Sequence, residues 1–402
     1  MGFAKTERDA VIVSAVRTPI GKFGGSLKGL RAHRLAAVVM DEALKRAGLA
    51  GADLDEVIAG ECIQCPDEAN TARTAALAAG IPVEVPAFTV QKQCSSSMQA
   101  LGSARLLVIA GEARAVLVVG VESMSNAPYV LKTARWGQRL THGEMTDSLW
   151  ELLNSGSRIL GHEMIMGLTA ENLAERHGIS RADQDEVALR SHRNAEAAIR
   201  AGRFDDEIVP VRVPGRKGET VVETDEHPRF GLTLEDLAKL PPAFKEGGTV
   251  TAGNSSGLND GAAAVVVTSR HRARSLGLPI LGRVLAQTSA GVPPEIMGYG
   301  PVPATRRLLE RTGIGLGDIG LVELNEAFAA QYLACERDLG LDRERVNVNG
   351  SGIGLGHPVG ATGLRLVVSL VHEMRRRGVG LGLATLCVGG GMGMATLVEA
   401  EG

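Results

Sequence analysis

The amino-acid sequence predicts an α/β fold with a largely parallel sheet, built as two related halves with a different segment between them. Short apolar runs typical of buried strands alternate with helical patterns in residues 10–123, and this alternation predicts parallel strands joined by helices. The same alternation returns in residues 260–400. Residues 126–251 differ, because two helical stretches are joined there by irregular segments. We therefore expect an insertion that interrupts the α/β body.

Each element of the first half follows from its local pattern. Runs of β-branched and aliphatic residues predict strands, and apolar residues at helical spacing predict helices. Pro19 ends the first strand and Gly51 follows the first helix, as expected for stop signals. In order, the predicted elements are a strand at 10–19, a helix at 34–49, a strand at 54–60, a helix at 94–111 and a strand at 114–123.

The insertion and the second half continue the series. Residues 180–202 predict one helix, in which Ser180 and Asp183 fit a capping box and Gly202 lies near the end. Strand and turn residues follow at 209–231. The second half is then predicted as a strand at 260–269, a strand running into a helix at 317–340, a helix at 356–378 and a glycine-broken pair of strands at 381–400.

The two halves also share a sequence pattern. "LDEVIAGECIQ" in the first half resembles "IGLVELNEAFA" in the second. Cys94 opens a buried helix that is followed by a strand, and His357 does the same. Such a repeat indicates two related domains, and if they pack about a pseudo-dyad the starts of these two helices approach each other. The alternative is two independent βαβ units.

The bulk composition is that of an ordinary globular protein. Of its 402 residues, 44% are apolar and 22% are charged, and the net charge is -3. No basic tract predicts a nucleic-acid or membrane partner, and no apolar run reaches the roughly 18 residues that a membrane span needs. The five cysteines are odd in number and sparse, which favours a reducing compartment, and we expect a cytoplasmic protein.

Cys94 lies in "VQKQCSSSMQA", between a short strand and a helix. The free N–H groups and the dipole of a helix start favour an anion, lower the pKa of a thiol and make it a nucleophile. The alternative is a small buried cysteine of the core. Cys62 and Cys65 form a lone C-x-x-C pair, which we interpret as two incidental thiols rather than a zinc or redox site.

Three further motifs carry side chains suited to catalysis. His357 lies between glycine and proline in the glycine-rich stretch 347–363, where it is held rigidly and can serve as a base; a structural histidine is the alternative. Asn325 and Glu326 follow a strand and point into a cleft, unless they only cap a helix. Cys387 ends a strand and meets three glycines, so a ligand can approach its backbone. A polar, glycine-rich loop at 251–263 is suited to cradling a substrate.

In this order, the motifs resemble those of the thiolase family, the acetyl-CoA acetyltransferases and 3-ketoacyl-CoA thiolases. The resemblance runs from "VRTPIGKFGG" to "CVGGGMG" and includes "GVESMSNAPY" and "NDGAAA". It implies duplicated α/β domains in five layers, α-β-α-β-α, with an inserted loop domain. The implied divisions are an N-terminal domain at 1–125 plus 252–280, a CoA-binding loop domain at 126–251 and a C-terminal domain at 281–402.

The resemblance also implies a role for each residue of the site. Cys94 accepts the acyl group, and His357 takes the proton of its thiol. Cys387 is the second acid and base. Asn325 holds a water that forms, with His357, an oxyanion site for the enolate. The backbone N–H groups of Cys94 and Gly389 form the other oxyanion hole.

The same resemblance implies where CoA binds, mainly on the inserted segment. Ser256 contacts the pantetheine arm and Arg229 lies near the adenine nucleotide. Met166 and Phe244 line the pantetheine tunnel, for which core packing is the alternative, and Phe328 lines the acyl side.

The implied reaction is the reversible cleavage of a 3-ketoacyl-CoA by CoA. No metal or redox cofactor is expected, since CoA is a substrate, and the family forms homodimers or homotetramers. Two other functions stay open: a 3-ketoacyl synthase type of condensing enzyme, which the second cysteine disfavours, and a CoA- or lipid-binding protein with little turnover. The sequence departs from the family pattern at Ser97, where glycine is usual, at Gln91 and at Ile165, and we expect Ser97 to influence acyl specificity.

Overall fold

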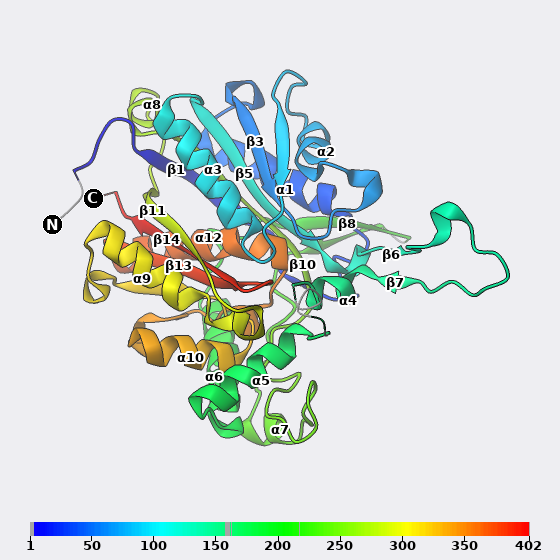
Figure 1. Ribbon diagram of the computed structural model, residues 1–402. Helices are drawn as coiled ribbons and strands as arrows, with labels where there is room; N and C mark the ends of the chain where they lie inside the picture. The colour runs from blue at the N-terminus through cyan, green and yellow to red at the C-terminus, as the bar shows by residue number, and fades with distance from the viewer. Residues whose placement is uncertain (1–3, 157–160, 162, 217, 402) are drawn as a thin grey trace.

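The computed structural model describes residues 4–156, 161, 163–216 and 218–401, and Figure 1 shows their arrangement. One large twisted sheet runs through the molecule in the order β12-β13-β14-β11-β1-β10-β5-β3-β4, with β2 paired to β10. Its strands are β1 (Ala10–Arg17), β2 (Gly21–Lys22), β3 (Glu56–Gly60), β4 (Ala87–Val90), β5 (Ala115–Ser123), β10 (Asn259–Ser269), β11 (Gly282–Gly291), β12 (Leu321–Leu324), β13 (Leu381–Val388) and β14 (Met392–Glu399).

The two halves of this sheet have the same order of parallel and antiparallel neighbours. In the first half β3 and β5 are parallel, and β5, β10 and β1 follow as antiparallel neighbours. In the second half β12 and β13 are parallel, and β13, β14 and β11 are antiparallel neighbours. The halves meet at β1 and β11, where Val11 pairs with Arg283 and Ile12 pairs with Gly282. The predicted internal repeat is therefore present in the fold.

The prediction of a largely parallel sheet is wrong. Within the described residues, the parallel pairs are β3–β4, β3–β5 and β12–β13, and the remaining ladders of the large sheet are antiparallel. The reason is that only some of the consecutive strands are connected by a helical crossover. β13 and β14 are joined directly by a glycine turn, and such hairpins produce antiparallel neighbours.

Two helices, α3 (Ser96–Ala110) and α12 (Val359–Arg377), form the middle layer of the molecule. They pack on each other and on strands of both halves, and their side chains share one hydrophobic core with both halves of the sheet. A second core lies under α1 (Ala32–Ala47) and α2 (Thr71–Ala78), and a third lies under α5 (Met166–His177), α9 (Pro301–Thr312) and α10 (Ala329–Leu339). This is the predicted five-layer α-β-α-β-α order, and Figure 1 shows α12 at its centre. The outer helices are α1 (Ala32–Ala47), α2 (Thr71–Ala78), α8 (Arg270–Ser275), α9 (Pro301–Thr312) and α10 (Ala329–Leu339), and the short α11 (Gly352–Leu355) precedes α12.

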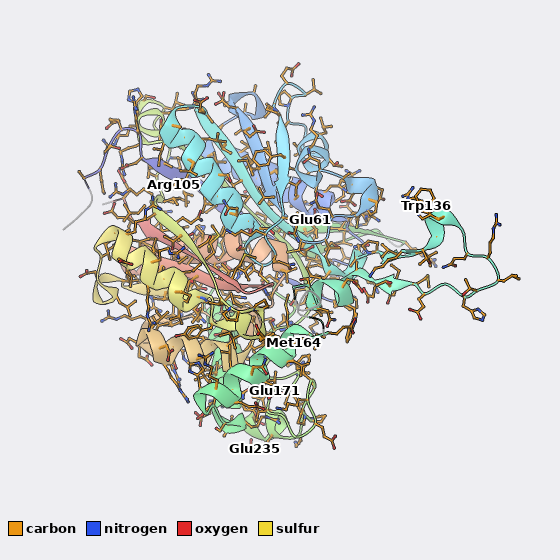
Figure 2. All side chains as sticks on the ribbon, in the orientation of Figure 1. Glu61, Arg105, Trp136, Met164, Glu171 and Glu235 are labelled. Carbon is orange, nitrogen blue, oxygen red and sulfur yellow. The ribbon has the colours of Figure 1, made fainter. Side chains whose placement is uncertain are left out.

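The segment between β5 and β10 forms separate structure on one side of the body. A hairpin of β6 and β7 projects away from the molecule, with Trp136 near its far end (Figures 1 and 2). Residues 157–160 and 162 lie outside the described residues. The elements are β6 (Tyr129–Val130), β7 (Thr146–Asp147), α4 (Ser148–Leu153), α5 (Met166–His177), α6 (Arg181–Arg200), β8 (Val211–Gly215), β9 (Gly218–Val222) and α7 (Leu234–Ala238). The exact domain boundaries stay predictions.

The predicted capping box of α6 is confirmed. The Ser180 side chain accepts a hydrogen bond from the Asp183 backbone, and the Asp183 carboxylate accepts one from the Ser180 backbone. Replacing Ser180 with alanine is expected to lower the free energy of unfolding by about 1 kcal/mol, because a helix N–H loses its partner. Urea denaturation measures this. The mid-helix Ser103→Ala variant is the control and should change stability by less than about 0.5 kcal/mol.

Candidate active site

One cavity of about 410 Å³ brings the predicted site together. It lies where the segments before α3 and α12 meet the end of β13 and residues of the insertion. The predicted site residues that line it are Cys94, His357, Cys387, Ser256, Arg229, Met166, Phe244 and Phe328. The other two lie directly beside it. Asn325 Nδ2 is 3.5 Å from His357 Nε2, and the Gly389 backbone N–H lies near enough to the Cys94 thiol to act on its pKa.

Cys94 and His357 hold matching places in the two halves. α3 begins at Ser96 and α12 begins at Val359, so each reactive residue lies two positions before its helix rather than opening it. The residue before Cys94, Gln93, has a positive φ of 49°, which turns the chain sharply at this point. The predicted approach of the two helix starts is confirmed by the packing of α3 on α12.

The thiol of Cys94 is not acidic, contrary to the sequence prediction. Burial raises the pKa of Cys94 to about 11, although the backbone N–H groups of Gly389 and Cys94 itself act in the opposite direction. The cost of burying a thiolate therefore exceeds the benefit of these donors. The thiol is neutral at pH 7 and needs a base to release its proton. The resemblance implies an oxyanion hole made of the same two N–H groups, and both act on the Cys94 thiol.

His357 is held in an orientation that supplies this base. Its Nδ1 lies 2.6 Å from the Thr362 hydroxyl, which itself donates to the Pro358 carbonyl at 2.9 Å. Because the hydroxyl proton is used there, Thr362 accepts from Nδ1–H, and the lone pair is on Nε2. Nε2 faces the Asn325 amide. Burial, with a smaller effect of the Arg365 charge, lowers the pKa of His357 to about 3, so the ring is neutral.

Replacing Thr362 with valine is expected to lower kcat by about 10- to 100-fold, because the acceptor that fixes the tautomer of His357 is lost while the volume is kept. Thr362→Ser keeps the hydroxyl and should retain most activity. Steady-state kinetics of both variants, with thermal melting as a check on folding, measures the effect. Equal activity of the valine and serine variants would contradict this role.

Cys387 and Asn325 come to the site on neighbouring parallel strands. Cys387 lies near the end of β13, and Asn325 directly follows β12. The Asn325 N–H donates to the Thr385 carbonyl at 3.0 Å, which continues the ladder and fixes the two residues at the same edge. Burial, and then the nearby Cys94, raise the pKa of Cys387 well above its ordinary value. Two thiols and one imidazole thus share the cavity, all in their neutral forms.

Aromatic and sulfur side chains form the apolar wall of the cavity. Phe244 and Phe328 meet edge to face, with ring centroids 6.1 Å apart. A Cβ on Gly167 would lie 2.3 Å from the Phe244 ring, and one on Gly389 would lie 2.5 Å from the Met166 methyl group. Met166 and Phe244 therefore pack closely and also line the cavity, and their place along a pantetheine arm stays a prediction.

The departures from the family pattern lie in different environments. The Ser97 hydroxyl accepts from the Leu364 N–H at 2.9 Å, and this residue is not among the described residues that line the cavity. Ser97 therefore ties α3 to α12, and its predicted influence on acyl specificity has no support in the cavity. Ile165, by contrast, lines the cavity, and Gln91 is exposed.

Glu326 and the C-x-x-C pair have structural contacts outside the cavity wall. The Glu326 carboxylate accepts from Ser191, from the Asn347 amide and from the Ile353 backbone, and so braces the loop before α12. Cys62 contacts the Ser96 hydroxyl, and Cys65 contacts the Asn126 carbonyl.

The sequence reasoning missed two histidines of the cavity, His192 on α6 and His227. Their rings stack with centroids 6.1 Å apart. Burial lowers the pKa of His192 to about 3 and that of His227 to about 4, so both rings are neutral at pH 7. His192 could not be found from the sequence, because a lone histidine on a long amphipathic helix carries no functional signal. His227 could have been found, because it stands only two residues before Arg229, which was predicted to lie near CoA.

The comparisons with known proteins cover the whole length. Residues 10–271 match the family described as "Thiolase, N-terminal domain", and residues 278–400 match "Thiolase, C-terminal domain". An acetyl-CoA acetyltransferase of Syntrophomonas wolfei is 49% identical, with 98% of this chain and 99% of that protein covered. The crystal structure of the Bacillus anthracis acetyl-CoA acetyltransferase superposes with a TM-score of 0.95 at 55% identity, covering 98% of this chain and 99% of that one.

A structure of human mitochondrial 3-ketoacyl-CoA thiolase in complex with CoA is also similar, with a TM-score of 0.93 at 42% identity and 98% of both chains covered. Both family matches, the long alignments and the shared fold agree with the cavity and its two cysteines. The chain belongs to the thiolase family.

Proposed function

We propose that this protein is an acyl-CoA thiolase, an acyltransferase that cleaves a 3-ketoacyl-CoA with CoA and catalyses the reverse condensation of acetyl-CoA. One observation supports this above the others. The cavity holds Cys94, His357 and Cys387 together, with the N–H groups of Cys94 and Gly389 directed at the nucleophilic sulfur. These are the groups that an acyl-cysteine reaction with two proton transfers requires.

In the first proposed half-reaction, His357 Nε2 takes the thiol proton of Cys94, and the sulfur attacks the 3-keto carbon. The N–H groups of Cys94 and Gly389 hold the oxyanion. The bond between C2 and C3 then breaks, leaving an acyl group on Cys94 and the enolate of acetyl-CoA. Cys387 gives its proton to C2 of this enolate. Each oxyanion-hole donor contributes roughly 10²–10³ to the rate.

In the second proposed half-reaction, the resulting Cys387 thiolate takes the thiol proton of CoA. The CoA sulfur attacks the acyl-cysteine, and Cys94 leaves as a thiol that recovers its proton from His357. The Asn325 Oδ1 atom is buried and has no hydrogen-bond partner among the described residues. This free acceptor supports the predicted water, which stabilises the enolate oxygen together with His357.

The CoA contacts belong to the same proposal. Arg229 and Ser256 contribute polar atoms to the cavity, while Met166, Phe244 and Phe328 supply its apolar wall. This combination suits a pantetheine arm that ends in a thioester.

We also propose that CoA serves only as substrate, that no resident metal or redox cofactor takes part, and that the protein acts in the cytoplasm as a homodimer or homotetramer. In the described part of the chain, no helix has the length and apolar character to cross a membrane.

Incubation with CoA and either acetoacetyl-CoA or a longer 3-ketoacyl-CoA tests the function. Loss of the absorbance of the ketoacyl-CoA enolate, with acetyl-CoA as a product, is the expected result, and the relative rates define the acyl length. Binding of CoA without turnover of any chain length would instead favour the CoA-binding alternative.

A further inference from the structure

His227 connects the inserted segment to the loop that carries His357. Its Nδ1 lies 3.3 Å from the side-chain nitrogen of Asn259, and the backbone carbonyl of Ile353 lies beside the ring as an acceptor that opposes the lowering of its pKa. Ile353 belongs to α11, four residues before His357. His227 itself lines the cavity that also holds Cys94 and His357.

Asn259 is the other half of this connection. Its Oδ1 accepts from the His357 backbone N–H at 2.9 Å, and its Nδ2 donates to the Gly21 carbonyl at 2.9 Å. The side chain is fully buried. Gly356, with a φ of +102°, packs against the amide so closely that a Cβ there would lie 2.8 Å from it. Asn259 therefore fixes both the backbone of His357 and the turn before it.

The hydrogen bonds define the state of the His227 ring. Because one N–H of the Asn259 amide goes to Gly21, the other is available for His227 Nδ1, which must accept. The ring proton is then on Nε2 and goes to Ile353. A protonated imidazole would set an N–H against the amide N–H. A single neutral tautomer thus satisfies both partners. The His192 ring stacks on the His227 ring.

We propose that His227 and Asn259 form a positioning pair that holds the His357 loop in place relative to the CoA-binding insertion. The pair rests on the proposed function, since it assigns to the insertion a part in aligning the base as well as in binding CoA. His227 acts through Asn259 and Ile353 rather than on the reacting atoms. A base displaced by about 1 Å is expected to cost up to about 100-fold in rate.

Two substitutions of His227 separate positioning from other roles. His227→Phe keeps the ring volume and the stacking but loses both hydrogen bonds. His227→Gln offers an amide that can accept from Asn259 and donate to Ile353. Two assays are used. The first measures kcat and KM for thiolysis. The second measures the rate at which iodoacetamide alkylates Cys94 without CoA, which reports thiol activation by His357. His372→Phe is the matched control, because His372 contacts the Ala15 carbonyl away from the cavity.

The expected result is a fall of about 10-fold or more in both kcat and the alkylation rate for His227→Phe, with KM for CoA changed less than about 2-fold and most of the rate restored in His227→Gln. Asn259→Asp should lower both rates similarly, and adding His227→Phe to it should have little further effect. If His227→Phe folds poorly, Asn259→Asp and His227→Gln still test the pair, since only the first should lower both rates.

Other outcomes would overturn the proposal. An unchanged alkylation rate with a raised KM for CoA would make His227 a ligand contact only. Equal losses in the Phe and Gln variants would show that its hydrogen bonds do not matter. The alkylation assay needs no turnover, so a wild-type protein without thiolysis would contradict the proposed function while the positioning pair is still tested.

Discussion

Cys94→Ala is expected to abolish thiolysis, with a loss of about 10⁴-fold or more, because the proposed acyl intermediate forms on its sulfur and the Cys387 thiol serves as acid and base instead. The serines that follow Cys94 are already engaged: Ser96 accepts from the Lys92 N–H and Ser97 accepts from the Leu364 N–H. None of them has a base comparable to His357. Loss of acetoacetyl-CoA with CoA present measures the effect.

Cys65→Ala is the matched control for this variant, since Cys65 is a buried cysteine that contacts a backbone carbonyl outside the cavity. It should keep wild-type kinetics to within about 2-fold, as expected for a site away from the chemistry. Residual turnover in Cys94→Ala above about one part in a thousand would point to another nucleophile.

Cys387→Ala is expected to lower turnover by about 10³-fold while leaving the first acyl transfer from acetyl-CoA to Cys94 largely intact. The reason is that His357 takes the proton of the Cys94 thiol and can pass it to the departing CoA sulfur, whereas proton transfer at the α-carbon depends on Cys387. The two effects are separated by measuring steady-state thiolysis beside the burst of CoA released from acetyl-CoA in a single turnover.

The control for Cys387→Ala is Cys335→Ala. Cys335 is buried on α10 and is not among the described residues that line the cavity. Loss of the acetylation burst in Cys387→Ala, to the same extent as turnover, would contradict the division of labour between the two thiols. Retention of full turnover would remove Cys387 from the mechanism.

Local patterns in the sequence were enough to place most of the elements, because strands such as 10–17 and helices such as 181–200 have clear periodicity and stop signals. Strand pairing was not predictable in the same way. β1 and β10 are separated by more than two hundred residues, and their antiparallel pairing depends on how the inserted segment returns to the sheet. No local pattern encodes that direction.

The site shows the same division between local motif and tertiary surroundings. Cys94, His357 and Cys387 stand in motifs that are visible in the sequence, and the fold brings them into one cavity. The pKa of Cys94 was predicted in the wrong direction, since it depends on burial by segments that are distant in sequence. The partner of Ser97, Leu364, was equally invisible.

The positioning contacts behind His357 were also beyond sequence reasoning. Thr362 stands five residues after the histidine, near the start of α12, but its role depends on a second hydrogen bond of its hydroxyl, to Pro358. Asn259 reaches the His357 backbone from the start of β10, about a hundred residues earlier in the chain. Such contacts emerge only once the two halves and the insertion are packed together.

The central claim, that Cys94 carries the acyl group, is tested most directly by mass spectrometry of the protein after brief incubation with acetyl-CoA. Acid quenching and proteolysis should yield an acetylated peptide in which Cys94 is the modified residue, and the Cys94→Ala variant should show none. An acetyl group on Cys387, or on Ser95, Ser96 or Ser97, or no covalent acetyl group in a protein that turns over acetoacetyl-CoA, would contradict the account.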